Sequence, residues 1–370
     1  MRIIMIDYFL PENPYAYELT KELRKKVDIE LFCRENIGKS DSFLFCRSEL
    51  YCGNDKKIIA AIKYFKGIQT LLKEIKNDCA VIHVQAFQHK KIELFLFKML
   101  RRKNRILVHT VHNILPHENK ESMREIYGKI YKTCDLLIVH NDWSKRELQS
   151  NFNISAEKIK VIPHGIYGNL RTCPAKPERK TTQFLFFGSI RKYKGVDVLL
   201  QAIALLPSDV KELCSFVIAG NQKAHHDITD YPAMAEELGI SNNVCFVLHY
   251  LEGQELDKLI CNADACIFPY HEIYGSGALL MAYTYQKPVI ASNVPAFIEE
   301  TENGQTGLLF ESGNPQSLAD MIEKFVKLDS RQKQKFSENI RILAEEKYNW
   351  KSSADKTFKA YLSVLNKSNR

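Results

Sequence analysis

The stretch 269–292, PYHEIYGSGALLMAYTYQKPVIAS, contains a complete strand, loop, helix and strand. An apolar run ends at Tyr270, and the triplet Gly275-Ser276-Gly277 then opens the apolar segment ALLMAYTY, which we expect to be a helix. A second apolar run, PVIAS, follows directly. Two strands separated by a helix are typical of parallel α/β sheets, so this stretch predicts such a sheet.

The same alternation of strand-like and helix-like segments extends outward through both halves of the chain. Residues 166–181 hold one Gly, two Pro and several charges without periodicity, so we expect a linker there. We therefore predict a domain over 1–168, a second domain over 169–347, and a terminal helix over 348–370 that packs back on the first domain. Ligands of open α/β sheets bind beyond the carboxyl ends of the strands, so we expect the site in a cleft between the domains.

Composition excludes several classes of protein. The chain has 370 residues, of which 45% are hydrophobic and 26% charged, which is typical of globular proteins and excludes a largely disordered one. No window approaches eighteen consecutive apolar residues, so no transmembrane helix is expected. The N-terminal MRIIMIDYF reads as a first strand and not as a secretory signal. The ten cysteines form no C-x-x-C pair, and we expect them to be buried, reduced thiols of a cytoplasmic protein.

Charge is distributed unevenly between the two halves. Residues 1–165 hold 29 Lys and Arg against 20 Asp and Glu, whereas the remainder holds 23 against 24. The excess is densest over 56–76 and in the run Arg101, Arg102, Lys103 and Arg105. Such a surface suits an anionic partner, which can be a membrane face, a lipid phosphate or nucleic acid, and the interpretation we carry forward is an anionic membrane surface. Solvated helix faces are the alternative, and nucleic acid is not expected because no recognition module or interleaved aromatics accompany the charge.

The loop at 188–195, GSIRKYKG, links a predicted strand to the predicted helix VDVLLQAI. Arg191, Lys192 and Lys194 supply three cations, and the helix N-terminus adds N–H groups and partial positive charge. This combination suits a diphosphate, whereas a solvated basic turn is the alternative. The loop is not a P-loop, because G-x-x-x-x-G-K-[ST] is absent. Gly275-Ser276-Gly277 opens a helix in the same way and predicts a second anion seat, although Ser276 also reads as an N-cap.

A third loop, HTVHNILPHE at 109–118, follows a strand in the first half. Three histidines within ten residues favour a functional role, with His112 and Asn113 at the end of the strand. Metal binding is not expected, because no zinc-type spacing occurs.

At this point the sequence resembles a known family. GSIRKYKGVDVLLQAI and the block 269–310 resemble the C-terminal domain of GT-B glycosyltransferases of family 4. TVHNILPHE, LIVHNDWSKREL, KIKVIPHG and YNWKSSADKTFKAYL extend the resemblance over nearly the whole chain. It implies an α/β fold of two Rossmann-like domains facing across a cleft, the first on the acceptor side and the second binding a nucleotide sugar. It also implies a retaining, metal-independent transferase without a cofactor.

The resemblance assigns roles to individual residues. Those implied to be catalytic are His112, beside the donor sugar, Arg191 and Lys194, on the donor diphosphate, and Glu272. Those implied to bind the donor are Gly188, Ser189, Gly220, Tyr274, Ser276, Gly277, Ala278 and Leu279. On the acceptor side we expect Asn13, Asn113 and His117.

Two departures from the family pattern stand out. Typical members carry a pair of glutamates before the Pro-Val of this block, whereas here Met281 holds the second position and Ile273 the first, with Glu272 adjacent. Met281 cannot accept hydrogen bonds from ribose hydroxyls. The Gly-Gly turn often found after the first strand is replaced by LPENPY at 10–15.

The sequence therefore predicts a glycosyltransferase that moves a sugar from a nucleotide-diphospho-sugar to a glycan or lipid-linked glycan. The expected setting is exopolysaccharide, capsule or lipopolysaccharide assembly, in the cytoplasm or peripherally on the inner face of the membrane. Two alternatives remain open. One is a sugar-nucleotide-binding protein that has lost turnover, suggested by Met281, and the other is a sugar-nucleotide epimerase of similar architecture.

Overall fold

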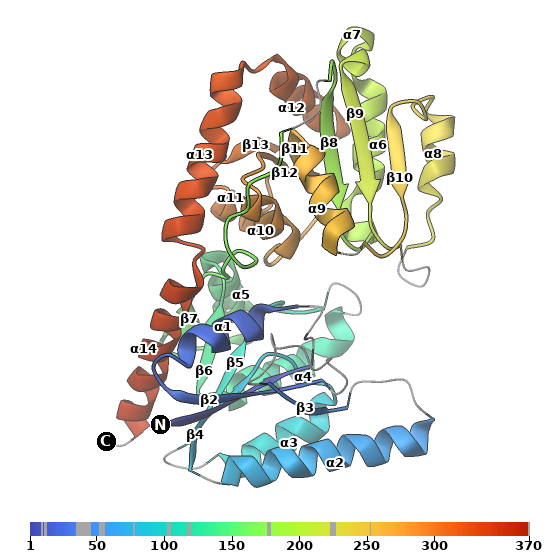
Figure 1. Cartoon of the computed structure of the whole chain (residues 1–370). Coiled ribbons are helices and arrows are strands. Elements are labelled where there is room, and N and C mark those ends of the chain that lie inside the picture. Colours follow the sequence, from blue (N-terminus) through green and yellow to red (C-terminus); the bar gives the residue numbers. More distant parts are fainter. Residues whose placement is uncertain are drawn as a thin grey trace. The chain divides into compact units, whose positions relative to one another are not determined.

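A computed structural model describes residues 1–8, 10, 13–34, 46–51, 56–76, 78–101, 105–116, 120–175, 179–222, 227–251 and 253–368. The chain divides into two compact units (Figure 1). Unit 1 comprises residues 1–165 together with 348–370, and unit 2 comprises residues 166–347.

Unit 1 is built on a seven-stranded parallel sheet with the order β3-β2-β1-β4-β5-β6-β7. Its strands are β1 (Arg2–Asp7), β2 (Asp28–Arg34), β3 (Cys46–Leu50), β4 (Cys79–Val84), β5 (Ile106–Thr110), β6 (Leu136–Val139) and β7 (Ile159–Val161). Its helices are α1 (Tyr15–Leu23), α2 (Lys57–Lys76), α3 (Lys90–Leu100), α4 (Lys120–Thr133), α5 (Asp142–Phe152), the short 3-10 helix η2 (Ala156–Lys158) and α14 (Trp350–Ser368).

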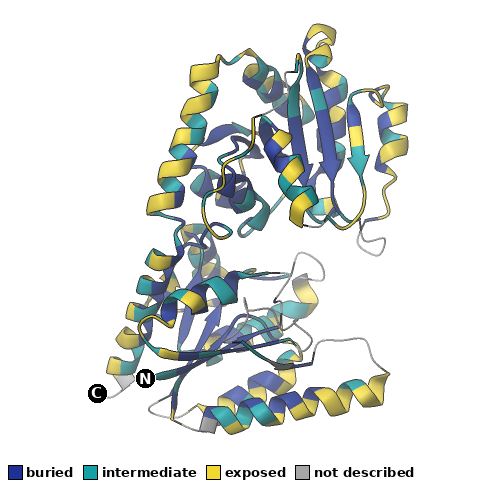
Figure 2. Ribbon diagram, viewed as in Figure 1, coloured by how far each residue is buried: buried dark blue, intermediate teal, exposed yellow. Residues whose placement is uncertain are grey.

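The core of unit 1 joins the start of the chain to its end. The central strands are apolar and almost fully buried, as buried parallel strands require (Figure 2). Trp350, Ala354 and Tyr361 of α14 belong to the same buried cluster as Tyr15 and Leu19 of α1. The C-terminal helix is therefore part of the hydrophobic core of unit 1.

Unit 2 is built on a six-stranded parallel sheet with the order β10-β9-β8-β11-β12-β13. Its strands are β8 (Thr182–Phe187), β9 (Cys214–Ala219), β10 (Val244–Val247), β11 (Ala265–Phe268), β12 (Val289–Ser292) and β13 (Gly307–Phe310). Its helices are η3 (Lys192–Lys194), α6 (Val196–Leu205), α7 (Ser208–Glu212), α8 (Tyr231–Glu237), α9 (Gly253–Asn262), α10 (Gly277–Thr284), α11 (Pro295–Glu300), α12 (Pro315–Lys327) and α13 (Ser330–Glu346). The α/β fold class predicted from the sequence is confirmed.

The first part of the segment predicted to be a linker is not a free connection between the units. It is packed into unit 2. The backbone N–H of Tyr167 donates to Oγ1 of Thr284 at 3.1 Å, and that of Arg171 donates to the carbonyl of Thr284 at 2.8 Å. Arg171 also pairs with Asp257 at 2.9 Å. These contacts, and not a periodic pattern, hold this irregular stretch in place.

The expectation of reduced, buried thiols throughout also requires correction. Cys173 and Cys261, separated by 88 residues, form a disulfide in unit 2. Cys245 is exposed, whereas Cys33, Cys79, Cys134, Cys214 and Cys266 form no disulfide and are buried as expected. None of the described helices is long and apolar enough to cross a membrane.

Candidate functional site

In unit 2 the order of strands along the sheet reverses between β8 and β11. From β8 the chain proceeds to β9 and β10 on one side, and it then returns to β11, β12 and β13 on the other. Neighbouring loops diverge at such a switch point and leave a crevice beyond the carboxyl ends of the strands. Residues 188–195 follow β8 and residues 269–276 follow β11. The two predicted phosphate loops therefore leave adjacent strands at the switch point.

Glycines permit the close approach of these loops. A β-carbon at Gly195, where φ is +64°, would lie 2.0 Å from the carbonyl oxygen of Pro269. A β-carbon at Gly220, where φ is +149°, would lie 1.8 Å from the carbonyl oxygen of Gly188. Neither space admits a side chain, so both positions need glycine. Gly220 thus holds the loop after β9 against the loop after β8.

Lys194, in the loop that follows β8, is buried. Its Nζ lies 5.1 Å from the centre of the Tyr270 ring. The ammonium charge therefore makes a favourable cation–π interaction with this ring. Burial, and to a lesser degree the charge of Arg191, lowers the pKa of Lys194 to about 8. A buried ammonium held this way gains most when an anion arrives to neutralise it.

The rest of the basic loop surrounds Lys194 less tightly. Arg191 is half-buried, and its Nε lies 3.4 Å from Oγ of Ser189, to which it donates. Gly188 is also half-buried, and a β-carbon there would come within 3.2 Å of Nζ of Lys194. Lys192, by contrast, is exposed. The structure therefore brings Gly188, Arg191 and Lys194 together and directs Lys192 to solvent.

The start of α10 is the second part of the crevice. Oγ of Ser276 accepts from the N–H of Leu279 at 3.2 Å, so Ser276 is the N-cap. No acceptor among the described residues takes the N–H groups of Gly277 and Ala278, which precede the first turn's internal bonds. The loops that carry the two parts are joined directly, because the N–H of His271 donates to the carbonyl of Tyr193 at 2.8 Å and the ring of Tyr270 lies 5.1 Å from Nζ of Lys194. The buried hydroxyl of Tyr270 has no hydrogen-bond partner among the described residues.

Two residues that the sequence did not single out adjoin this helix start. A β-carbon at Gly277 would lie 2.4 Å from the hydroxyl oxygen of Tyr167, so only glycine fits beside that phenol. Oε1 of Glu300 accepts from the N–H of Ser276 at 3.3 Å. Burial raises the pKa of Glu300 to about 8, so its carboxyl is largely protonated at neutral pH. Tyr167 stands in an aperiodic segment and Glu300 in a short helix, so local pattern could not reveal either.

The other residues expected to bind the donor lie along the same loop and helix. Leu279 is buried, whereas Glu272, Tyr274, Ala278 and Met281 are half-buried. Met281 lies in α10, four residues beyond the helix start at Gly277. Glu272 is not in α10, so it belongs to the loop and not to the helical face that carries Met281.

In unit 1, His112 follows β5 and joins a network of buried and half-buried polar side chains. Its Nε2 lies 3.0 Å from Oε1 of Gln85, and its Nδ1 lies 3.2 Å from Nε2 of His140. Nδ1 of His140 is 3.0 Å from the carbonyl of Ile162, which can only accept. Burial, reinforced by the neighbouring histidines, holds the pKa of His112 well below its ordinary value. His112 is therefore a neutral, oriented imidazole at physiological pH.

The ring of Tyr15 packs against the histidines of this network. Its ring meets His112 edge-on at 4.8 Å and lies 4.9 Å from the ring of His164. Burial lowers the pKa of His140 to about 4 and that of His164 to about 3. The network was not predicted, because its members come from separate strands and no single stretch of sequence contains them.

The remaining unit 1 candidates have varied surroundings. Oδ1 of Asn13 accepts from the N–H of Tyr15 at 3.1 Å, so this side chain orients the start of α1. Asn113 is exposed. His109 is buried with Nδ1 2.8 Å from the carbonyl of Val84, which is a structural role. His117 lies outside the described residues.

In the basic run 101–105, Arg105 does not contribute to the surface expected of it. Arg105 is buried and donates from Nε to the carbonyl of Cys79 at 2.9 Å, and Arg101 pairs with Asp135. Arg102 and Lys103 lie outside the described residues. Across the part of the chain that is described, no group of three His, Cys, Asp or Glu side chains is arranged to hold a metal ion.

Two family models divide the chain between them. The model described as Glycosyl transferases group 1 matches residues 174–342, and the one described as Glycosyltransferase Family 4 matches residues 13–167. The chain belongs to the GT-B glycosyltransferases of the family 4 type. This glycosyltransferase is an enzyme of the transferase class, and the resemblance in its sequence is confirmed at that level.

Relatives span the whole length of this glycosyltransferase. An uncharacterized glycosyltransferase of Methanocaldococcus jannaschii is 24% identical, with 98% of each chain covered. A D-inositol 3-phosphate glycosyltransferase of Corynebacterium diphtheriae is 24% identical over 94% of this chain and 88% of its own. Sucrose-phosphate synthase from Thermosynechococcus elongatus superimposes with a TM-score of 0.77 at 18% identity, covering 99% of this chain and all of its own. Anabaena Alr3699/HepE in complex with UDP and glucose gives 0.75 at 17%, covering 98% and 100%. These structures establish the GT-B fold of two Rossmann-like domains.

Proposed function

We propose that this glycosyltransferase moves a sugar from a nucleotide-diphospho-sugar to a glycan or lipid-linked glycan acceptor with retention of the anomeric configuration. The observation that carries the proposal is the direct contact between the loop that holds Lys194 and the loop that leads into α10: Nζ of Lys194 lies 5.1 Å from the centre of the Tyr270 ring, and Gly195 lies against the carbonyl of Pro269. A buried ammonium and a helix N-terminus together match the two negative phosphates of a diphosphate.

A nucleotide sugar is the anion that we favour for this site. The diphosphate would occupy Arg191, Lys194 and the N–H groups of Gly277 and Ala278, which leaves the nucleoside toward the loop at Gly220. Anabaena Alr3699/HepE, which shares the fold, is known bound to UDP and to UDP-glucose, and this supports a nucleotide-sugar donor here. Met281 stands where a glutamate would accept hydrogen bonds from the ribose hydroxyls. The contacts to the diphosphate therefore supply a larger share of the binding free energy of the donor.

The chemistry follows from stabilising the departing diphosphate. The bond from the anomeric carbon to the diphosphate oxygen breaks, and the acceptor hydroxyl oxygen bonds to the same face of that carbon. The hydroxyl proton passes to an oxygen of the departing diphosphate, so the step needs no base from the protein. Negative charge builds on the diphosphate as the bond breaks, and Arg191, Lys194 and the α10 dipole stabilise it.

Unit 1 supplies a hydrogen-bonding group and not a charged acid. His112 is neutral and both of its ring nitrogens contact Gln85 and His140, so in the proposed reaction it exchanges one of these contacts for a hydroxyl of the donor sugar, which it then orients. The acceptor-side roles of Asn13, Asn113 and His117 and the role of Glu272 stay part of the proposal. So do a cytoplasmic location, independence from metal ions, and a place in exopolysaccharide, capsule or lipopolysaccharide assembly.

The proposal is tested by donor binding and turnover in the same variants. Nucleoside diphosphates and their sugars are screened for a rise in melting temperature, and the best donor is incubated with candidate glycan acceptors. Arg191→Ala and Lys194→Ala should each abolish turnover, whereas Lys192→Ala, in the same loop but exposed, should leave it intact. Full turnover in either of the first two variants refutes the assignment. A stable donor complex that never turns over favours a binding protein, and an epimerised donor favours an epimerase.

A further inference from the structure

Helix α2 carries two apolar faces, and the core of unit 1 uses only one of them. Tyr64, Ile68, Leu71 and Ile75 recur at intervals of four, three and four residues and are buried. A second set, Ile58, Ile59, Ile62 and Phe65, is exposed. Figure 2 shows the exposed first half of the helix in yellow. An ordinary surface helix has one apolar stripe, so the second face requires an explanation outside the core.

Helix α3 repeats this feature. Ile92, Phe95 and Met99 recur at intervals of three and four residues and are exposed, whereas Leu94 and Phe97 are buried. The seven side chains Ile58, Ile59, Ile62, Phe65, Ile92, Phe95 and Met99, which we name the apolar face, are between 41% and 77% exposed. They make up nearly half of the large apolar side chains that the described residues expose, which is more than scattered surface apolars explain.

A buried carboxyl fixes the two helices to each other. Oε1 of Glu93 on α3 accepts from the hydroxyl of Tyr64 on α2 at 3.1 Å and from the hydroxyl of Tyr8 at 2.7 Å. Glu93 itself is fully buried. The apolar face is therefore displayed by a pre-arranged pair of helices, which lie side by side in Figure 1.

The exposed charged side chains on the described parts of these two helices are all of one sign. Exposed lysines flank it on both helices, namely Lys57, Lys63, Lys66 and Lys73 on α2 and Lys91 and Lys98 on α3. The only carboxylates of these helices are turned away, since Glu93 is buried and Glu74 pairs with Arg2 at 2.8 Å. Apolar side chains bordered by lysines are typical of helices that lie in the surface of an anionic membrane.

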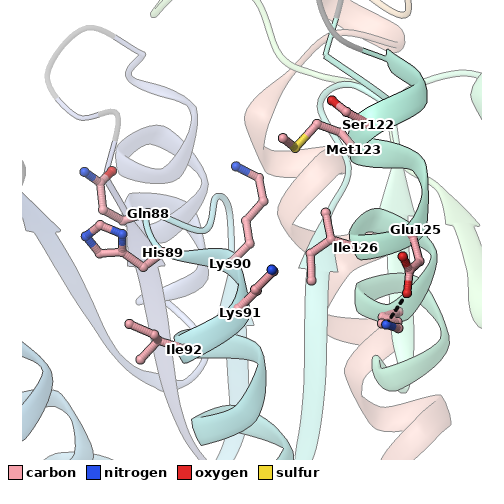
Figure 3. A pocket seen from close by; sticks show the side chains of 10 residues that line it. Gln88, His89, Lys90, Lys91, Ile92, Ser122, Met123, Glu125 and Ile126 are labelled. Atoms are coloured by element: carbon pink, nitrogen blue, oxygen red, sulfur yellow. Dashed lines mark hydrogen bonds and ion pairs between the residues drawn. The ribbon is translucent and has the colours of Figure 1, made fainter.

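A cavity beside the apolar face adds a place for a phosphate. It measures about 620 Å³ and lies between the start of α3 and α4 (Figure 3). Lys90, Lys91 and Lys129 line it, and the one carboxylate there, Glu125, pairs with Lys129. Lys90 contacts the ring of Tyr127 and Lys91 acts on Glu125 at longer range, so the cavity carries a net positive charge that suits an anion. Ile92 lines the cavity and also belongs to the apolar face, so the two are continuous.

We infer that α2 and α3 bind the surface of a membrane that contains anionic lipids. The side chains of the apolar face enter the interface, their lysines lie among the headgroups, and the cavity at Lys90 and Lys91 takes one lipid phosphate. This deepens the proposed function, on which its biological meaning rests, because a lipid-linked acceptor is found at such a surface. Membrane binding itself needs neither donor nor turnover.

The test is sedimentation of the full chain with vesicles, one set of phosphatidylcholine alone and one of phosphatidylcholine mixed with phosphatidylglycerol. Binding to the mixed vesicles is expected to exceed binding to the neutral ones. Ile62→Ser with Phe65→Ser, and separately Phe95→Ser with Met99→Ser, should each weaken it about tenfold or more. Lys90→Gln with Lys91→Gln should reduce the preference for the mixed vesicles, while the remaining lysines of α2 and α3 retain part of it. Ile342→Ser, an exposed apolar residue on α13 of unit 2, is the matched control and should bind as the wild type does.

Three results would overturn the inference. The first is no binding of the wild type to the mixed vesicles. The second is unchanged binding by both serine pairs, which leaves charge alone as the cause. The third is a dimer in gel filtration that the serine pairs convert to a monomer without altering vesicle binding, which assigns the apolar face to a second copy. The melting-temperature shift caused by the donor is measured on the same variants, so loss of donor binding and loss of membrane binding are distinguished.

Discussion

The hydroxyl of Tyr167 occupies the space beside Gly277 that a β-carbon would need, with 2.4 Å between that oxygen and the β-carbon position. The ring carbon that bears the hydroxyl would lie at 3.5 Å, an ordinary contact. Gly277→Ala should therefore displace Tyr167 and disturb the α10 start, lowering the melting temperature and the donor-induced shift. Tyr167→Phe removes the clashing atom.

This pair predicts strong non-additivity. Gly277→Ala introduced into Tyr167→Phe should be tolerated far better than in the wild type, with a coupling on the order of 1 kcal/mol or more in a double-mutant cycle. The measurement is thermal unfolding of the four proteins with and without the best nucleoside diphosphate. If the effects of the two substitutions are additive, the hydroxyl of Tyr167 is not the reason that position 277 requires glycine.

We expect the charged side chain of Lys194 to lower the stability of the fold while it is required for donor binding. Its pKa falls from 10.5 to about 8 on burial, so keeping it charged at pH 7 costs about 3 kcal/mol at the usual 1.4 kcal/mol per pH unit. Lys194→Met removes this cost and keeps the aliphatic stem. We expect a higher melting temperature and no donor-induced shift, with exposed Lys192→Met as the unaffected control.

The pH dependence of this effect has a definite sign. Between about pH 8 and the ordinary pKa of 10.5, the unfolded chain keeps the Lys194 proton that the folded chain has lost. The wild type therefore gains stability relative to Lys194→Met as pH rises through this window. A difference between the two proteins that stays constant from pH 7 to 10 argues against a buried ammonium.

Glu300 should make unit 2 less stable as pH rises. Its pKa is about 8 in the fold against 4.5 ordinarily, because it is buried. Between those values the folded chain holds a proton that the unfolded chain has released, so this contribution is full below pH 4.5 and is lost as pH rises through 8. Glu300→Gln cannot titrate, and its melting temperature should fall less steeply from pH 5 to 8. Glu299→Gln, one position earlier on α11, is the control, and parallel curves for wild type and Glu300→Gln would contradict the prediction.

His112 should affect turnover without affecting donor affinity. Removing a positioned polar group near a reacting centre commonly costs about a hundredfold in rate, so we expect a loss of that order in His112→Ala. Because its pKa lies well below the ordinary value, His112 should add no step near pH 6.5 to the rate profile. Asn113→Ala gives the comparison: an acceptor-side role predicts a higher KM for the acceptor alone. Loss of the donor-induced melting shift in His112→Ala would place its role elsewhere.

The sequence predicted the features that are encoded in short, continuous stretches, and it did not predict those that depend on contacts between distant segments. Alternating strand and helix patterns predicted the α/β class, and glycine-rich loops with cations predicted the crevice beyond β8 and β11. The edge strand β3, CRSEL, has no apolar run and was missed. Tyr167, Glu300 and Gln85 act through contacts between distant segments, which no local pattern encodes. The spacing in α2 predicted a helix, but only burial distinguishes its core face from its exposed one.

The central claim is that Lys194 and the start of α10 hold one diphosphate. A crystal structure with the best-binding nucleoside diphosphate tests it most directly. The account predicts phosphate oxygens within about 3 Å of both Nζ of Lys194 and the backbone nitrogen of Gly277 or Ala278. A nucleotide bound with its phosphates away from either group would contradict it.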